Sequence, residues 1–107
     1  MSVADVRVSN AALADFDEIM DYLERVAGRA VADRYAAEFT NVFEAIAAHP
    51  GLGAPRPRLG RDARLVSVPP YSIYYDGKPK GDIAIILRIV RGRRRATKAL
   101  VNQGRQG

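Results

Sequence analysis

Apolar positions in the first part of the chain change from a two-residue to a helical repeat. Residues 3–8 alternate between apolar and polar side chains and predict a short half-buried strand. Ser9 and Asn10 then offer side-chain oxygens that can cap the first turn of a helix over 11–26. The apolar residues at helical spacing in that helix are Ala12, Phe16, Ile19, Leu23 and Val26.

A second helix is predicted from Arg29 to Ala48, after a stop at Gly28. Its apolar stripe consists of Val31, Tyr35, Phe39, Val42, Phe43 and Ile46. His49 closes the helix before Pro50, and an imidazole there is better read as a C-terminal cap than as a catalyst. Because so few residues separate the two helices, we expect an antiparallel hairpin.

The second part of the chain reads as strands. A loop rich in Gly, Pro and Arg spans 51–61, and a hairpin loop spans 77–81. The strands are predicted over 64–68, 71–76 and 82–90, and the last is apolar on both faces except at Arg88, as expected for a covered central strand. The order β-α-α-β-β-β predicts an α+β fold of two layers, with the helical hairpin on a mostly antiparallel sheet of three or four strands. We expect one domain over 1–95 and a polar C-terminal tail over 96–107.

Composition narrows the function classes. The chain has 107 residues, no cysteine and one histidine, so disulfides and thiolate chemistry are excluded, and neither a metal site nor a cofactor is predicted. Gly51-Leu52-Gly53 follows a helix rather than a strand and does not match a dinucleotide-binding motif. No apolar run is long enough to span a membrane, and we expect a cytoplasmic protein without a membrane partner.

Charge is distributed unevenly along the chain. Residues 1–50 contain nine acidic residues and four arginines, whereas residues 51–107 contain thirteen basic residues and three aspartates. An acidic half joined to a strongly basic half is typical of a surface that meets an anionic partner.

Arginines in three groups are therefore candidates for binding a target or partner, because guanidinium groups make bidentate contacts with phosphates and carboxylates. Arg88 interrupts an apolar strand, and the alternative to a binding role is a structural ion pair with an acidic group on the helices. The candidates are Arg56, Arg58, Arg61 and Arg64; Arg88; and Arg91, Arg93, Arg94 and Arg95.

The first helix carries two further features. Leu13 and Met20 flank its apolar stripe and are candidates for an apolar edge that a partner covers, with ordinary widening of the core as the alternative. Its carboxylates are expected to form a solvated face; they are Asp15, Asp17, Glu18, Asp21 and Glu24.

The chain resembles the RelE/ParE toxin superfamily of type II toxin–antitoxin systems over about residues 5–95. The resemblance rests on the order and spacing of four segments. The first is Val8-Ser9 followed by Ala12, Asp15, Phe16, Ile19 and Tyr22 in the first helix, and the others are HPGLGAPRPRLG (49–60), RLVSVPPYSIYYD (64–76) and AIILRIVRGRRR (84–95). It is similar to the ParE branch in particular, although that branch more often has histidine where this chain has Arg91.

The resemblance implies a cognate antitoxin that wraps the toxin in a hetero-oligomer. ParE-like members inhibit DNA gyrase, whereas RelE-like members cleave mRNA on the ribosome. Cleavage requires proton transfer to and from the reacting oxygens, which arginine cannot provide readily because it stays protonated. Residues 76–107 contain no Tyr, His or Glu, so we predict no catalytic residue and favour a gyrase-directed toxin over a ribosome-dependent mRNA endonuclease. A non-toxic nucleic-acid-binding domain is the remaining alternative.

Overall fold

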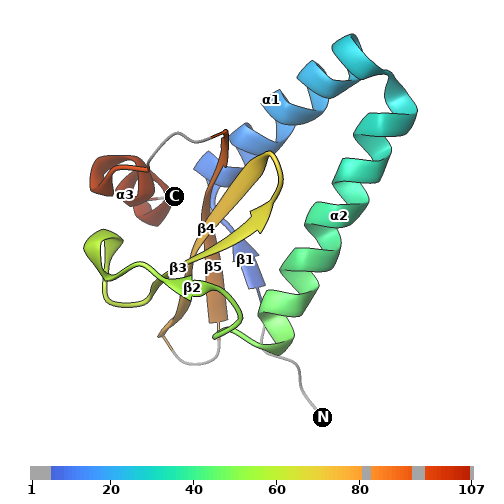
Figure 1. Ribbon diagram of the computed structural model, residues 1–107. Coiled ribbons are helices and arrows are strands. Elements are labelled where there is room, and N and C mark those ends of the chain that lie inside the picture. Colours follow the sequence, from blue (N-terminus) through green and yellow to red (C-terminus); the bar gives the residue numbers. More distant parts are fainter. Residues whose placement is uncertain (1–5, 81–82, 93–95, 107) are drawn as a thin grey trace.

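Two long helices form a hairpin on one side of the molecule in the computed structural model, which describes residues 6–80, 83–92 and 96–106 (Figure 1). Helix α1 spans Asn10–Ala27 and α2 spans Arg29–Ala48. The hydroxyl oxygen of Ser9 accepts a hydrogen bond from the backbone N–H of Ala12 at 3.0 Å, which confirms the predicted cap. Gly28 joins the helices with φ of 94°, a conformation that favours glycine.

A five-stranded sheet carries the hairpin, in the order β1-β5-β4-β3-β2. Strand β1 runs parallel to β5 and the other neighbours are antiparallel, so the sheet is mostly antiparallel as predicted. It has five strands instead of the expected three or four. Strand β4 extends to Lys80 and so includes most of the predicted hairpin loop. The short strand β2 lies within the predicted 51–61 loop. Two residues, the second a proline, are too few to show an alternation of apolar and polar side chains. The bounds are β1 Val6–Val8, β2 Ala54–Pro55, β3 Ala63–Val68, β4 Tyr71–Lys80 and β5 Ile83–Arg91, with a 3-10 helix η1 at Pro57–Leu59.

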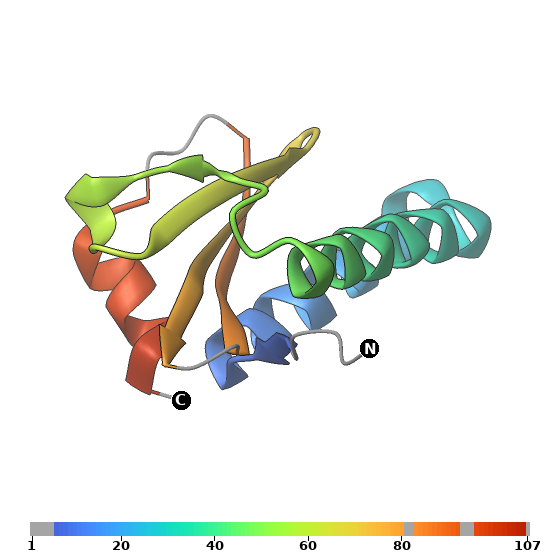
Figure 2. The same cartoon turned by 90° about the horizontal axis from the view of Figure 1, so that it is seen from below.

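Both faces of the sheet are covered. The hairpin face holds a core around Phe39, Ile73 and Ile86, and the opposite face holds a second core around Leu59, Leu87 and Val101. Figure 2 shows the hairpin and the C-terminal helix on opposite sides of the sheet. Strand β5 contributes to both cores, which confirms the prediction of a central strand covered on both sides.

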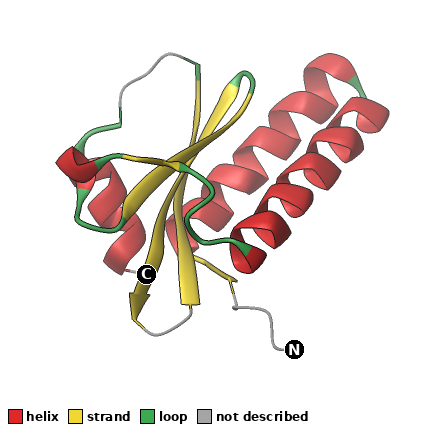
Figure 3. Cartoon of the chain, turned by 60° about the horizontal axis from the view of Figure 1, so that its bottom comes forward, coloured by secondary structure: helices red, strands yellow, loops and turns green. Residues whose placement is uncertain are grey.

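The C-terminal segment differs from the expected polar tail. Residues Lys98–Gln106 form helix α3, which packs against β5 and η1 (Figure 3). Val101 is fully buried, and the Arg105 guanidinium forms an ion pair with Asp76 of β4, with Nε 2.8 Å from Oδ2. The prediction of a polar tail was wrong because these nine residues contain one Leu-Val pair and show too little apolar periodicity by themselves to indicate a helix. Helix α3 covers the face of the sheet opposite the hairpin and so adds a layer to the two that were expected.

The closed end of the hairpin projects beyond the sheet (Figures 1 and 2). Val26, expected in the apolar stripe of the first helix, is therefore 56% exposed, because no strand lies under the end of α1. Within the described residues, no helix has the length and apolar character needed to cross a membrane.

Candidate functional site

Helix α1 lies along the edge of β5 at the point where β1 ends. The last pair of the β1–β5 ladder joins Val8 to Ile86. Beyond it, the Ser9 hydroxyl donates to the Leu87 carbonyl, and the Ile89 N–H donates to Asp15 Oδ2 at 2.9 Å. The side chains of Asp15 in α1 and of Ser9, its N-cap, thus take the place of a strand as hydrogen-bonding partners of β5.

Arg88 is held by the same carboxylate. Its Nε and Nη2 atoms donate to Asp15 Oδ2 and Oδ1 at 2.8 and 2.7 Å, and both side chains are largely buried. The hydrogen bonds that Arg88 donates to the Asp15 carboxylate raise the pKa of the Arg88 guanidinium above its usual value. Its remaining donor, Nη1, is 2.6 Å from Gln103 Oε1 and 3.4 Å from the Leu100 carbonyl oxygen of α3.

Two expectations are corrected by this geometry. Arg88 forms the structural ion pair that the sequence left open as its alternative, so its guanidinium is engaged within the fold. Asp15 is 8% exposed and does not belong to the solvated acidic face, because its position on α1 points it at the β5 edge. The other acidic candidates of that helix are exposed: Asp17, Glu18, Asp21 and Glu24.

Three of the four candidate arginines of the β2–η1–β3 segment donate hydrogen bonds to backbone carbonyls. Arg56 Nη1 donates to Pro55 O at 2.9 Å, and Arg58 Nη2 donates to Ala96 O at 3.1 Å. Arg64 Nη1 donates to Gly53 O at 2.7 Å and to Gly51 O at 3.2 Å. Like these three, Arg61 makes no ion pair with any carboxylate of the described residues. The positive charge of these four arginines is therefore not neutralised by a carboxylate of the described residues.

Arg91, at the end of β5, lies against an aromatic ring. Its guanidinium carbon is 5.4 Å from the ring centre of Tyr22, and that of Arg25 is 5.9 Å from the same centre. Arg91 also lowers the pKa of Tyr71, but burial is the larger effect and leaves that pKa above its usual value. Arg93, Arg94 and Arg95, predicted as part of the same group, lie outside the described residues.

The two apolar candidates of α1 occupy different environments. Leu13 is 48% exposed, whereas Met20 is half-buried and packs against the core beneath the hairpin. The two residues therefore do not form one exposed edge. Two other large apolar side chains are exposed farther along α1, those of Tyr22 and Val26.

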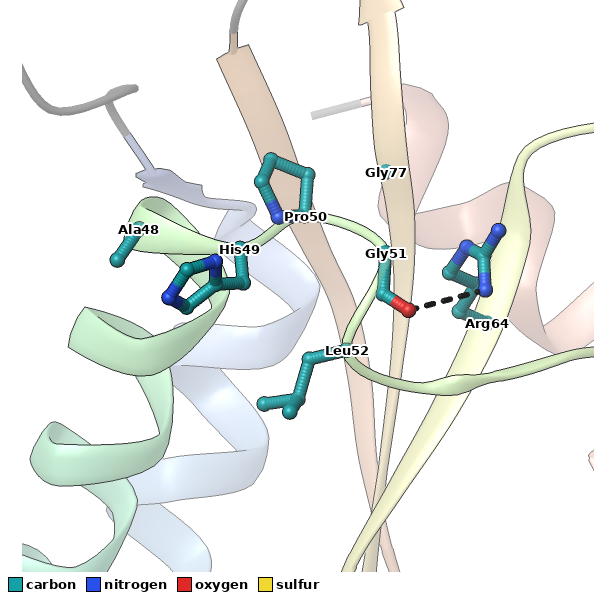
Figure 4. Close-up of a pocket in the computed structure, with 7 residues that line it drawn as sticks. All are labelled: Ala48, His49, Pro50, Gly51, Leu52, Arg64 and Gly77. Carbon is teal, nitrogen blue, oxygen red and sulfur yellow. Dashed lines mark hydrogen bonds between the residues drawn. The ribbon is translucent and has the colours of Figure 1, made fainter.

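A pocket of about 580 Å³ opens where α2 leads into the sheet. His49, at the C-terminal end of α2 as predicted, lines it together with Arg64 of β3. Figure 4 shows the imidazole on the helix side of the 50–52 loop and the guanidinium on the strand side. The sequence does not indicate that His49 and Arg64 lie close together, because fifteen positions separate them and only the fold brings both to one pocket.

Tyr75 of β4 forms hydrogen bonds with the loop that lines this pocket, and no feature of the sequence had indicated this role. Its hydroxyl accepts from the Gly53 N–H at 2.7 Å and donates to the Pro50 carbonyl at 2.8 Å. Burial raises the pKa of Tyr75 despite the opposing hydrogen bond from the Gly53 N–H.

Among the described residues, no group of three or more His, Asp or Glu side chains could hold a metal ion.

Known proteins are similar to this chain in sequence and in fold. Residues 6–96 match the family model described as the ParE toxin of the type II toxin–antitoxin system parDE. Toxin ParE1 of Caulobacter vibrioides is 36% identical over 69 residues, which cover 64% of this chain and 72% of that protein. The solved structure titled "Chromosomal ParDE TA system from P. aeruginosa" superposes with a TM-score of 0.70 at 24% identity, covering 85% of this chain and 98% of the other, which supports the fold. The chain belongs to the ParE toxin family of type II toxin–antitoxin systems.

Proposed function

We propose that this ParE-family toxin inhibits DNA gyrase by protein–protein contact in the cytoplasm and is neutralised by a cognate antitoxin. The observation that carries the proposal is the group Arg56, Arg58, Arg61 and Arg64, whose charge is not neutralised by any described carboxylate. The guanidinium groups of Arg56, Arg58 and Arg64 are held by backbone carbonyls, which positions them in advance for carboxylates of a partner surface.

Gyrase supercoiling in the presence of the purified toxin tests this proposal. We expect inhibition by the unaltered chain, and loss of inhibition in the triple variant Arg56→Ala, Arg58→Ala, Arg61→Ala. The matched control is Arg25→Ala, Arg29→Ala, Arg34→Ala, which removes the same charge from the hairpin. Full supercoiling activity with excess toxin contradicts the proposed target, and equal inhibition by both variants contradicts the assigned surface.

The His49 and Arg64 pocket favours a second candidate, cleavage of mRNA on the ribosome. An imidazole can transfer a proton near neutral pH, and a guanidinium can stabilise a phosphate, so the pocket supplies two groups that such a reaction needs. If the toxin cleaves mRNA on translating ribosomes, His49→Gln should slow cleavage by about a hundredfold or more. Unchanged mRNA in the presence of the unaltered toxin rejects this candidate.

A further inference from the structure

The loop that forms the pocket between the end of α2 and β3 is held in place by the fold. The Tyr75 hydroxyl binds both the Pro50 carbonyl and the Gly53 N–H, so the loop is fixed to β4 at both ends. A Cβ built at Gly77 would lie 2.7 Å from the Pro50 carbonyl oxygen, so glycine allows the loop to approach β4 this closely. The pocket is therefore formed before a partner arrives, which lowers the entropic cost of binding.

The cationic groups of the pocket have no carboxylate beside them. Nη1 of Arg64 donates to the carbonyls of Gly51 and Gly53, while its Nε and Nη2 have no hydrogen-bond partner among the described residues. The His49 imidazole is exposed, and no Asp or Glu belongs to the described residues that line the pocket. Because Nε and Nη2 lie on one edge of the guanidinium, they match the two oxygens of a carboxylate.

An exposed leucine adjoins these groups. Leu52 is 51% exposed, and Figure 4 shows its side chain on the same side of the loop as the His49 imidazole. Together with Pro50 it gives the pocket an apolar wall, and the volume of about 580 Å³ lies within the ~300–1,000 Å³ of pockets that bury ligands. A partner with an acidic side chain next to an apolar one therefore matches both parts of the pocket.

The lining of the pocket favours a protein over a nucleic acid. Nucleic-acid bases bind to proteins by stacking on aromatic rings, and no Phe, Tyr or Trp is among the described residues that line the pocket. The aliphatic surface of Leu52 and Pro50 would gain nothing from a sugar–phosphate backbone. An apolar centre with charged groups around it is instead the usual composition of a protein–protein interface.

The pocket is continuous with the arginine group through which we expect the toxin to contact gyrase. Arg64 belongs to both, and it pairs with Pro55 of β2, which directly precedes Arg56. We propose that the pocket anchors a segment of the target protein in which an acidic residue stands next to a large apolar one. The carboxylate binds Arg64, and the apolar side chain packs on Leu52 and Pro50. The inference rests on the proposed inhibition of gyrase and names the kind of segment that the toxin recognises.

Inhibition of gyrase supercoiling by variants of Leu52 provides the first test. Leu52→Asp places a carboxylate in the anchoring site, and we expect the toxin concentration for half-inhibition to rise by about tenfold or more. Leu52→Met keeps an apolar side chain of similar volume and should stay within about threefold. The matched control is Val26→Asp, at a position 56% exposed on the projecting end of the hairpin, which should stay within about twofold. Thermal unfolding of each variant verifies that the toxin remains folded.

Photochemical crosslinking provides the second test, because the chain has no cysteine of its own. A benzophenone attached to the thiol of Leu52→Cys should crosslink to gyrase at a segment with an acidic residue beside a large apolar one. The same probe on Val26→Cys should give no such crosslink. Mass spectrometry of the crosslinked peptides identifies the segment.

Several results overturn the inference while leaving gyrase as the target. Equal inhibition by Leu52→Asp and the unaltered toxin shows that the pocket does not contact the target, as does a missing crosslink from position 52. A crosslink to a gyrase segment without a carboxylate rejects the assigned chemistry, and a crosslink to DNA or RNA assigns the pocket to a nucleic acid. If the unaltered toxin itself leaves supercoiling unchanged, the proposed function fails.

Discussion

Asp15 connects two elements that are far apart in the sequence. Its carboxylate accepts two hydrogen bonds from Arg88 and one from the Ile89 N–H, all between 2.7 and 2.9 Å. A carboxylate and a guanidinium in a largely buried position lose hydration, and each needs the other as compensation. The pair therefore fixes α1 against β5 and belongs to the framework of the toxin.

Replacing one partner of this pair should be costly. Asp15→Asn leaves the Arg88 charge uncompensated, and we expect a loss of about 3–5 kcal/mol in the free energy of unfolding, measured by urea denaturation. The control is Asp33→Asn, which breaks the Arg29–Asp33 pair, where the atoms are 3.8 Å apart and the side chains 80% and 71% exposed. That change should cost about 1 kcal/mol or less. Equal losses in the two variants would contradict a special role for Asp15.

Helix α3 is the element that the sequence described least well. The two long helices have regular apolar stripes and clear stop signals, so their bounds follow from local pattern to within a residue or two. In α3, by contrast, the helix is stabilised by contacts with distant residues, including Asp76 and the second core. A pattern that depends on a partner elsewhere in the chain is invisible in a short window of sequence.

Gly104 sets how closely α3 approaches β5. A Cβ built at this position would meet the Leu87 carbonyl oxygen and lie 2.7 Å from its Cα. Gly104→Ala should therefore push α3 away and lower the free energy of unfolding by about 1–3 kcal/mol, with faster hydrogen exchange in 98–106. Gly51→Ala, where nothing lies within 4 Å, is the matched control and should change little. A neutral result for Gly104→Ala would contradict the close packing of α3.

At the scale of the whole molecule, exposed charge and buried tyrosines lie on different parts of the fold. Exposed carboxylates and arginines both occur on the hairpin, whereas the β2–η1–β3 segment exposes Arg56, Arg58 and Arg61. Tyr71 and Tyr75 of β4 are fully enclosed between the sheet and the hairpin, where burial favours the neutral phenol over the phenolate. Stability of the entire domain is consequently linked to the titration of these two groups.

The toxin should lose stability in alkaline solution. Both tyrosine pKa values are raised above the usual 10.0, so the unfolded chain releases these protons at a lower pH than the folded chain does. These groups leave the free energy of unfolding unchanged below about pH 9 and lower it as the pH rises through 10 and beyond. Urea denaturation at pH 7, 9 and 11 measures the slope, which should be shallower in Tyr71→Phe. An equal slope in that variant would contradict the assignment.

Local sequence pattern alone determined the hairpin, the three long strands and the covered position of β5, because the periodicity of apolar residues reports directly on which face of an element is buried. The same residues carried the family resemblance. The tertiary structure decided which arginines are paired with carboxylates. Arg88 forms an ion pair with Asp15, 73 positions away, whereas Arg91 is exposed beside Tyr22. The tertiary structure also decided the docking of α3 against β5 and the place of α1 along the edge of β5. Pairing of charges and the ends of neighbouring strands depend on distances between remote segments, and these exist only once the chain has folded.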